Sequence, residues 1–275
     1  MSEQKQWQLA GSAPELYQRF LVPAVTAIWA ADLVGQAALR PGERVLDVAC
    51  GTGVVARIAS ERVGNTGQVA ALDINAGMLA VAQSLPPVIG ARISWHEGSV
   101  LALPFAAAMF DVVLCQLGLQ FFPDRPAALQ ELRRILVSNG RLALNVFGPI
   151  EHNPATFALA NALDRRIYPG ASEAKRAEHM LADTGELGML IAAADFRDVE
   201  VRTVSKLVQF SSPAEYVRIQ LAATPLATLI AQYDAASKES LVATLIEDVS
   251  AELAPYFGDE GLCFPQEVHS VLAVK

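Results

Sequence analysis

The stretch Val45-Leu46-Asp47-Val48-Ala49-Cys50-Gly51-Thr52-Gly53 is a short apolar run that carries one acid and ends in a glycine turn. Apolar residues at helical spacing follow at once, over residues 54–63. Glycine lets the backbone adopt positive φ and lets a ligand approach more closely than a Cβ would permit. The free N–H groups of the helix would face that ligand. The stretch therefore predicts a strand that ends on a ligand.

The acid at Asp47 makes this stretch more specific than a glycine turn alone. A site built only for pyrophosphate gains nothing from a carboxylate beside it. We therefore expect a cationic group near Asp47.

The alternation of strand and helix patterns after Arg44 predicts parallel strands with crossover helices. The expected strands are Val45–Ala49, Gln68–Asp73, Arg92–Glu97, Phe110–Gln116, Arg141–Phe147, Asp198–Phe210 and Val268–Val274. The expected helices are Val54–Val63, Ala76–Leu85, Pro126–Val137, Pro154–Ile167 and Gly185–Ala194, with three or so helical pieces over Pro213–Tyr256. Before the first strand, Leu16 to Leu39 predicts one kinked helix or two short ones, broken at Pro23.

Residues 47–53, preceded by Pro41-Gly42 and followed by Leu72-Asp73, resemble the class I S-adenosylmethionine-dependent methyltransferases. The similarity is to the small-molecule branch that includes the ubiquinone and menaquinone biosynthesis methyltransferases. It runs from about Arg40 to Phe147, and more weakly through Ala193–Val199. The resemblance implies an α/β fold with a Rossmann-like, seven-stranded, mostly parallel sheet, helices on both faces and a helical cap. We expect an N-terminal helical lid (1–40), a cofactor-binding core (41–150) and the remaining sheet with the cap (151–275), all in one domain.

The resemblance also implies which residues bind S-adenosyl-L-methionine. Asp73 would accept hydrogen bonds from the ribose hydroxyls, an interpretation to be weighed against a helix N-cap. The other expected cofactor contacts are Asp47, Ala49, Gly51, Gly53, Ile74, Met78, Gly98, Ser99, Val100, Gln116 and Leu117, with Tyr17 closing over the cofactor. Ser99 stands where the family commonly has an acid. On the substrate side we expect Gln120, Phe121 and Phe122.

A general base is needed only if the acceptor holds a proton whose pKa is well above the working pH. His152, just past the fifth expected strand, is the candidate base, and a solvated loop histidine is the alternative. His179, in an expected cap helix, could serve equally.

Residues 51–56 also satisfy the G-x-G-x-x-A pattern of dinucleotide sites, and Asp73 lies 20 residues past Gly53. An NAD-dependent oxidoreductase is therefore the alternative activity. Dinucleotide sites do not require an acid at position 47, so we favour the methyltransferase. A cofactor-binding protein without transfer activity is the non-enzymatic alternative.

The composition narrows the partners and the compartment. The net charge is −8 and no Lys/Arg cluster appears, which argues against nucleic acid. No uncharged apolar run reaches the roughly 18–20 residues that a membrane helix needs, and no carboxylate cluster indicates a metal. Three widely spaced cysteines predict buried free thiols in a reducing compartment. We expect a cytoplasmic protein that acts on a small-molecule methyl acceptor; a homodimer stays open.

Overall fold

The computed structural model describes residues 11–275, and within that range one sheet has the strand order β3-β2-β1-β4-β5-β8-β6, with β7 paired to β8. Its strands are β1 Arg44–Val48, β2 Gln68–Asp73, β3 Ile93–Glu97, β4 Phe110–Gln116, β5 Leu136–Phe147, β6 Arg197–Phe210, β7 Phe257–Gly258 and β8 Gly261–Val274. Strands β1 to β5 pair in parallel, while β8 is antiparallel to both β5 and β6. The predicted mostly parallel Rossmann-like sheet is confirmed, with the two-residue β7 as an additional strand.

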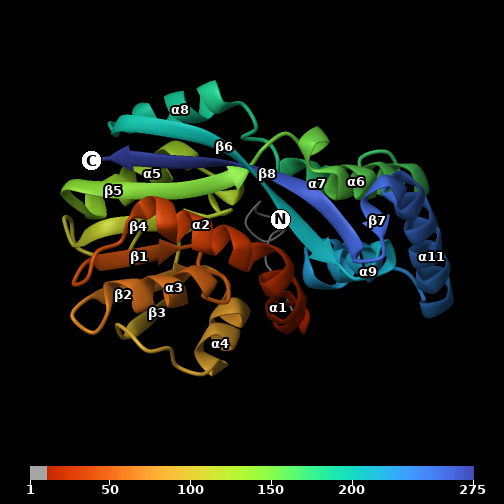
Figure 1. The fold of residues 1–275 in the computed structure, drawn as a ribbon, viewed down its shortest axis with the longest axis horizontal. Helices are drawn as coiled ribbons and strands as arrows, with labels where there is room; N and C mark the ends of the chain where they lie inside the picture. Colours follow the sequence, from red (N-terminus) through yellow and green to blue (C-terminus); the bar gives the residue numbers. More distant parts are fainter. Residues whose placement is uncertain (1–10) are drawn as a thin grey trace.

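The helices between these strands cover both faces of the sheet (Figure 1). They are α1 Ala13–Leu16, η2 Tyr17–Thr26, α2 Ala27–Ala37, α3 Val54–Val63, α4 Ala76–Ser84, α5 Arg125–Ile135, α6 Pro154–Arg166, α7 Glu173–Ala177, α8 Thr184–Ala192, α9 Pro213–Ala223, α10 Leu226–Ile230 and α11 Ala235–Glu252, with single 3-10 turns at η3 Leu119–Phe121, η4 Ile150–His152 and η5 Ala254–Tyr256. Buried residues of α2 and α3 pack on one face, and those of α5 and α8 pack on the other. β4 supplies both cores, because successive strand side chains point to opposite faces.

The sheet reverses its order between β1 and β4. Ligands of open α/β sheets bind at such a switch point, outside the carboxyl ends of the strands. The quoted stretch 45–53 therefore ends where a ligand site is expected.

Strands β6 and β8 continue beyond the sheet into the cap (Figure 1). β8 pairs with β5 only over Val268–Val274, whereas its pairing with β6 extends back to Leu262. The last strand was expected to begin at Val268 and begins at Gly261. The extra residues pair with β6 in a two-stranded ribbon whose apolar side chains join the cap core.

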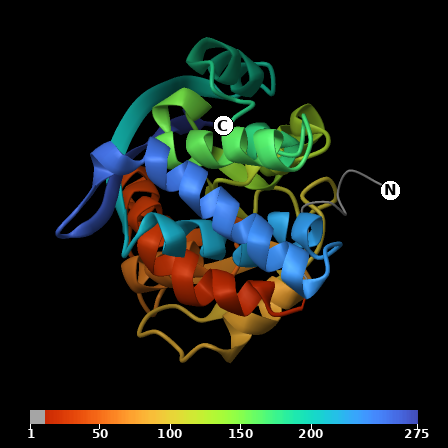
Figure 2. The same ribbon diagram turned by 90° about the vertical axis from the view of Figure 1, so that its right-hand side faces the viewer.

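The cap consists of α6, α9, α10 and α11 packed on this ribbon. Figure 2 shows α11 and α6 side by side on the outer face of the cap, and these two helices are in direct contact. The cap core is separate from the two cores of the sheet, so the molecule has a sheet half and a cap half.

The N-terminal helix bridges the two halves. Its middle part, η2, packs into the cap core, and most of the buried residues of α2 pack against the sheet. The chain stays helical through Pro23, where a π-helical stretch replaces the expected break. A wider helical turn accommodates a residue that lacks the N–H donor. By length and composition alone, Ala13–Ala37 could cross a membrane, but half of its most apolar window is buried inside the molecule.

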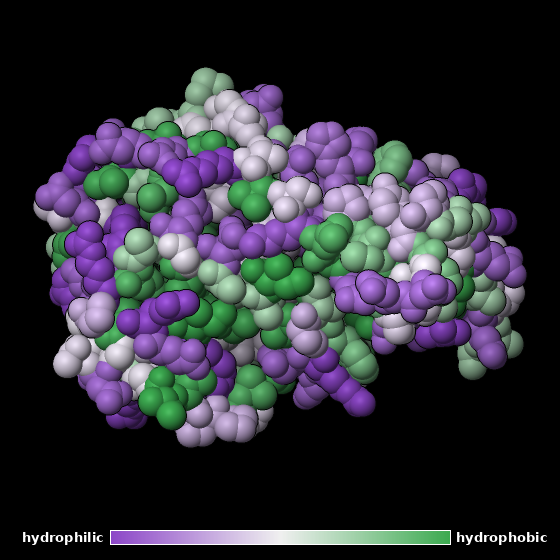
Figure 3. All heavy atoms as spheres, viewed as in Figure 1, coloured by the Kyte–Doolittle hydropathy of each residue, from purple (hydrophilic) through white to green (hydrophobic). Residues whose placement is uncertain are grey.

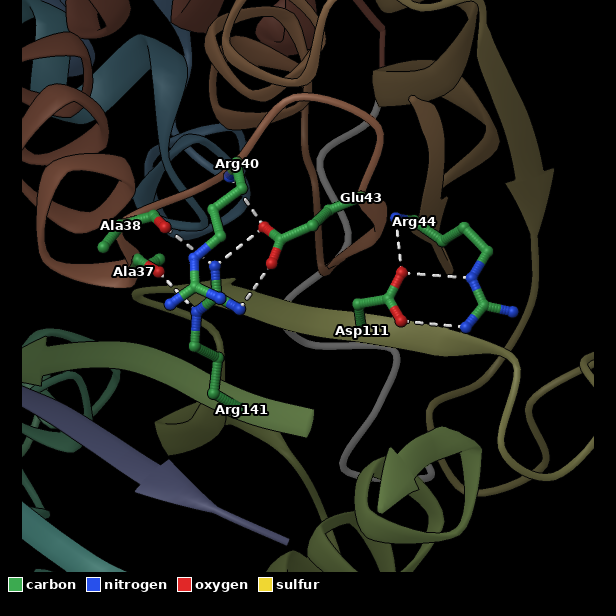
Figure 4. Close-up of polar contacts among 7 residues, drawn as sticks. All are labelled: Ala37, Ala38, Arg40, Glu43, Arg44, Asp111 and Arg141. Atoms are coloured by element: carbon green, nitrogen blue, oxygen red, sulfur yellow. Dashed lines mark hydrogen bonds and ion pairs between the residues drawn. The ribbon is translucent and has the colours of Figure 1, made fainter. Parts of the chain in front are cut away.

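Polar contacts attach this helix to the sheet at the edge opposite the switch point (Figure 4). Arg141 of β5 donates to both carboxylate oxygens of Glu43 at 2.8 Å and to the carbonyl of Ala37, at the end of α2. Nearby, Arg44 makes a bidentate pair with Asp111, joining the first residue of β1 to the second residue of β4. The Arg141 contacts fix where α2 ends relative to the central strands.

The cysteines are free within the described residues. Cys50 and Cys115 are buried as predicted, but Cys263 is partly exposed because it lies on the ribbon outside the sheet core.

Candidate functional site

A cavity of about 310 Å³ runs from the carboxyl ends of β1, β2 and β4 to the inner side of the cap. Its walls combine the loops that follow these strands with side chains of η2, α6, α7, α9 and the β6–β8 ribbon. Figure 3 shows hydrophobic surface gathering where the two halves of the molecule meet, with hydrophilic residues toward both ends. The site is therefore shared between the sheet half and the cap half.

The glycine turn after β1 forms the floor of the cavity. Ala49, Gly51 and Gly53 all have positive φ, between +55° and +85°. Ala49 and Gly51 line the cavity, and a Cβ on Gly51 would meet nothing within 4 Å. Gly53 does not line it; a Cβ there would lie 2.4 Å from the ring of Trp95. Gly51 thus leaves room for a ligand, while Gly53 allows close packing of the loop.

Asp73 connects this turn to the end of β2. Its Oδ2 accepts a hydrogen bond from the Gly51 N–H at 2.7 Å, and its Oδ1 accepts one from the Asn75 N–H at 2.8 Å. Burial raises the pKa of Asp73, although these bonds counteract the shift. The N-cap of α4 is Asn75, which accepts from Gly77 and Met78. The alternative role of Asp73 as that cap is therefore wrong, and its carboxylate lies in the cavity wall.

Asp47 lies behind the glycine turn rather than in the cavity wall, contrary to the expected direct contact. Its Oδ2 accepts from the Ala56 N–H at 2.9 Å, and its Oδ1 is buried without a hydrogen-bond partner. Burial raises the pKa of Asp47 well above its usual value, and the nearby Asp73 adds to this effect. Within residues 11–275, no cationic side chain forms an ion pair with it. The expected cationic group is thus not a side chain of the described residues.

The loops after β2 and β3 form one side of the cavity. Ile74, Met78, Gly98, Ser99 and Val100 all line it, as predicted. Ile74 is 40% exposed, so an apolar face is available for a ring. The Ser99 hydroxyl accepts from the Leu101 N–H at 3.2 Å, which uses part of its acceptor capacity in the loop itself.

The loop after β4 forms the opposite side. Gln116 and Leu117 line the cavity; Gln116 donates to the Thr26 carbonyl at 3.0 Å and keeps a buried Oε1 without a partner. Phe121 and Phe122 also line it. Gln120 does not, because its amide folds back to donate to the Leu117 carbonyl at 3.0 Å. The prediction of Gln120 as a substrate contact is therefore corrected.

Tyr17 of η2 lies in the cavity wall above the glycine turn, in the place expected for a lid. Burial raises the pKa of Tyr17 to about 12, and the nearby Asp73 and Asp47 contribute in the same direction. The phenol is therefore a neutral hydrogen-bonding group at physiological pH.

Neither candidate histidine base lines the cavity. The His152 side chain is 59% exposed and its Nδ1 lies 3.0 Å from Glu267, whose hydrogen bond raises the pKa of His152. The solvated alternative describes this residue, and His152 is withdrawn as the candidate base. His179 is buried, stacks on Phe147 and donates from Nδ1 to the Gly148 carbonyl at 2.7 Å. Both rings are thus placed by structural contacts.

The cap contributes wall residues that the sequence analysis did not identify. They include Thr156, Lys175, Glu178, Tyr216, Gln220 and Phe264. These positions come from four separate elements, and the segment around Lys175 has the composition of an ordinary solvated helix. No local signal in the sequence distinguishes them.

Comparisons with known proteins agree with this geometry. Residues 45–140 match the model of a methyltransferase domain. The ubiquinone/menaquinone biosynthesis C-methyltransferase of Xanthomonas campestris is 40% identical over 124 residues, which are 44% of this chain and 49% of that protein. The chloroplastic 2-phytyl-1,4-beta-naphthoquinone methyltransferase of Arabidopsis thaliana is 35% identical over 149 residues, 53% and 57% of the two chains. The chain thus spans about half the length of these curated relatives.

Solved structures share the fold over most of the chain. The YcgJ protein of Bacillus subtilis superposes with a TM-score of 0.58 at 19% identity, covering 90% of this chain and 97% of that one. Phosphoethanolamine N-methyltransferase 2 of Haemonchus contortus, solved with S-adenosyl-L-methionine, gives a TM-score of 0.53 at 18% identity, covering 90% and 52%. The oxidoreductase alternative receives no support from these similarities. Residues 45–140 are therefore similar to a methyltransferase domain, and the predicted resemblance to the class I methyltransferases of quinone biosynthesis is confirmed.

Proposed function

We propose that this protein transfers the methyl group of S-adenosyl-L-methionine to an O, N or C atom of a small metabolite held under the cap. The observation that carries the proposal is the continuous cavity, which joins a carboxylate-bearing turn at the switch point to an apolar chamber. The cytoplasmic location is likewise a proposal and not a finding, because the relative from Arabidopsis thaliana is named as chloroplastic.

Two groups of the sheet half fit the cofactor in particular. Asp73 has a carboxylate in the wall with acceptor capacity beyond its two backbone bonds, which suits vicinal ribose hydroxyls. The unpartnered Oδ1 of Asp47 lies behind the turn, where its charge would favour a cationic ligand. Buried polar atoms ordinarily have partners, so this carboxylate oxygen is open to a bridging water or a further donor.

The remaining wall residues have roles that follow from their positions. Ile74 and Met78 would pack on the adenine, and the buried Oε1 of Gln116 would accept a hydrogen bond from the methionine portion. When bound, the sulfonium supplies an activated methyl carbon for in-line displacement. The protein then needs to align the acceptor and to exclude water, which the apolar cap and the Tyr17 lid would do.

Isothermal titration with S-adenosyl-L-methionine, S-adenosylhomocysteine and NAD tests this function. We expect both adenosyl ligands to bind and NAD not to bind. Asp73→Ala removes the acceptor of two charge-assisted hydrogen bonds worth about 1.5–3 kcal/mol each, so affinity should fall about 100-fold or more. Asp111→Asn is the matched control, because Asp111 pairs with Arg44 at the opposite ends of the strands. Binding of NAD alone would overturn the proposal.

A further inference from the structure

The cap end of the cavity contains a buried ion pair in a wall that also carries several aromatic side chains. Lys175 Nζ lies 2.9 and 3.0 Å from the two carboxylate oxygens of Glu178. Their side chains are only 6% and 12% exposed, and both residues line the cavity. Two opposite charges are therefore presented together at one end of the chamber.

This ion pair adds no connection between elements of the fold. Lys175 is in α7, and Glu178 is the residue that follows the end of α7, three positions after Lys175. Removing two charges from water is costly, and apolar replacements of buried pairs are often neutral or stabilising. A pair that costs desolvation free energy and joins only its own helical turn is better explained by a ligand than by stability.

Aromatic side chains of the cap line the same cavity as the pair. Phe210 and Phe264 stack with an interplanar angle of 2°, and Tyr216 meets both rings edge-on. Burial raises the pKa of Tyr216, so its hydroxyl stays neutral. Gln220 lines the same chamber and has a buried Oε1 without a hydrogen-bond partner. Aromatic walls favour a ring, and the open acceptor of Gln220 favours a ligand with a donor.

The ion pair has no net charge, and this favours a neutral polar substituent on a bound ring over a charged one. A carboxylate or an ammonium would leave an uncompensated charge in the chamber, which is unfavourable in a low-dielectric environment. A hydroxyl is neutral; its oxygen can accept from an ammonium while its hydrogen is donated to a carboxylate. The Lys175–Glu178 pair offers both partners side by side.

We propose that the cap end of the cavity binds an aromatic acceptor through a ring hydroxyl, with Lys175 donating to the hydroxyl oxygen and Glu178 accepting its proton in a hydrogen bond. This assignment of substrate class rests on the proposed function for its catalytic meaning, but the binding itself does not require transfer.

The test is titration of the intact protein with 2-naphthol, naphthalene, 2-naphthoate and 2-naphthylmethylammonium, each with and without saturating S-adenosylhomocysteine. We expect 2-naphthol to bind at least tenfold more tightly than naphthalene and more tightly than either charged probe. Lys175→Met combined with Glu178→Leu removes both charges together and should abolish this preference while naphthalene binding persists. Glu178→Gln, a milder change, should reduce the preference for 2-naphthol over naphthalene.

The control is Glu200→Gln combined with Arg202→Gln, which removes an ion pair that is exposed on β6. It should leave the preference for 2-naphthol intact. Equal binding of 2-naphthol and naphthalene, tightest binding of a charged probe, or an unchanged preference in the double variant would overturn the proposal. Failure of S-adenosylhomocysteine to bind would instead contradict the proposed function, and the naphthol series without it still tests the pair.

Discussion

The two halves of the cavity are built in different ways. In the sheet half, the ligand-facing groups follow β1, β2 and β4 within a few residues of each strand end, and backbone conformation at Ala49 and Gly51 shapes the floor. In the cap half, the wall is assembled from single side chains of α6, α7, α9 and the β6–β8 ribbon. The sheet half therefore depends on a short continuous motif, and the cap half depends on tertiary packing.

This difference separates the properties that each half can determine. A glycine turn at a switch point binds whatever fits its backbone, so it specifies a cofactor class. Side chains on packed helices can change without altering the sheet, so we expect them to determine the acceptor. Damage to one half should then affect one ligand and spare the other.

The strongest test of the sheet half is Gly53→Ala. The new Cβ would lie 2.4 Å from the Trp95 ring at a residue with φ of +85°. Left-handed strain and overpacking should together lower the free energy of unfolding by about 2–4 kcal/mol and abolish binding of S-adenosylhomocysteine. Denaturant titration and calorimetry measure the two effects. Gly35→Ala is the control, since its Cβ meets nothing within 4 Å inside α2, and it should be neutral or stabilising.

The corresponding test of the cap half is Leu245→Ala. Leu245 is fully buried in the cap core, and Leu114 is fully buried in the sheet core. Leu245→Ala and its counterpart in the sheet, Leu114→Ala, should each lower the free energy of unfolding by about 2–5 kcal/mol. In Leu245→Ala, hydrogen exchange should accelerate in α9 and α11 but not in β1 to β4, and S-adenosylhomocysteine affinity should persist. Leu114→Ala should accelerate exchange in the sheet. Loss of protection across both halves in Leu245→Ala would show that they are one cooperative unit.

The same contrast explains what the sequence could predict. Strands β2 and β4 were predicted with their bounds, because continuous apolar runs between turns are local signals. Of the sheet-half residues, Asp73 and Gly51 lie in the cavity wall, whereas Asp47 lies one layer behind it. Lys175 and Glu178 were missed because their burial depends on how α7 packs. The sequence around them is equally typical of a solvent-exposed helix. Whether these residues contact ligands is still a prediction.

Asp47→Asn tests whether the buried carboxylate of the sheet half acts on stability and on ligand binding separately. Because the folded pKa of Asp47 is raised by burial, its favourable contribution is complete at low pH and is lost as pH rises above the ordinary value of 3.8. The neutral amide removes this dependence, so the variant should gain stability relative to the native protein as pH increases. It should also bind S-adenosyl-L-methionine about tenfold more weakly, since a buried charge partner is lost. Chemical denaturation at pH 5 and pH 8, with calorimetry, measures both effects, and an unchanged affinity would argue against the cationic ligand.

The smallest expected effect lies where the two halves meet, at Tyr17. Tyr17 lines the cavity shared by both halves, and it also packs with the cap core. Tyr17→Phe removes one neutral hydrogen-bonding group worth about 0.5–1.5 kcal/mol, so S-adenosylhomocysteine affinity should fall by less than about tenfold. Because burial raises the pKa of Tyr17 to about 12, the phenol does not ionise below pH 9, and the affinity ratio between native and variant proteins should be the same at pH 7 and pH 9. A ratio that changes between pH 7 and pH 9 would mean that the Tyr17 phenol ionises in this range, and therefore that it is more open to solvent than its place in the cavity wall indicates.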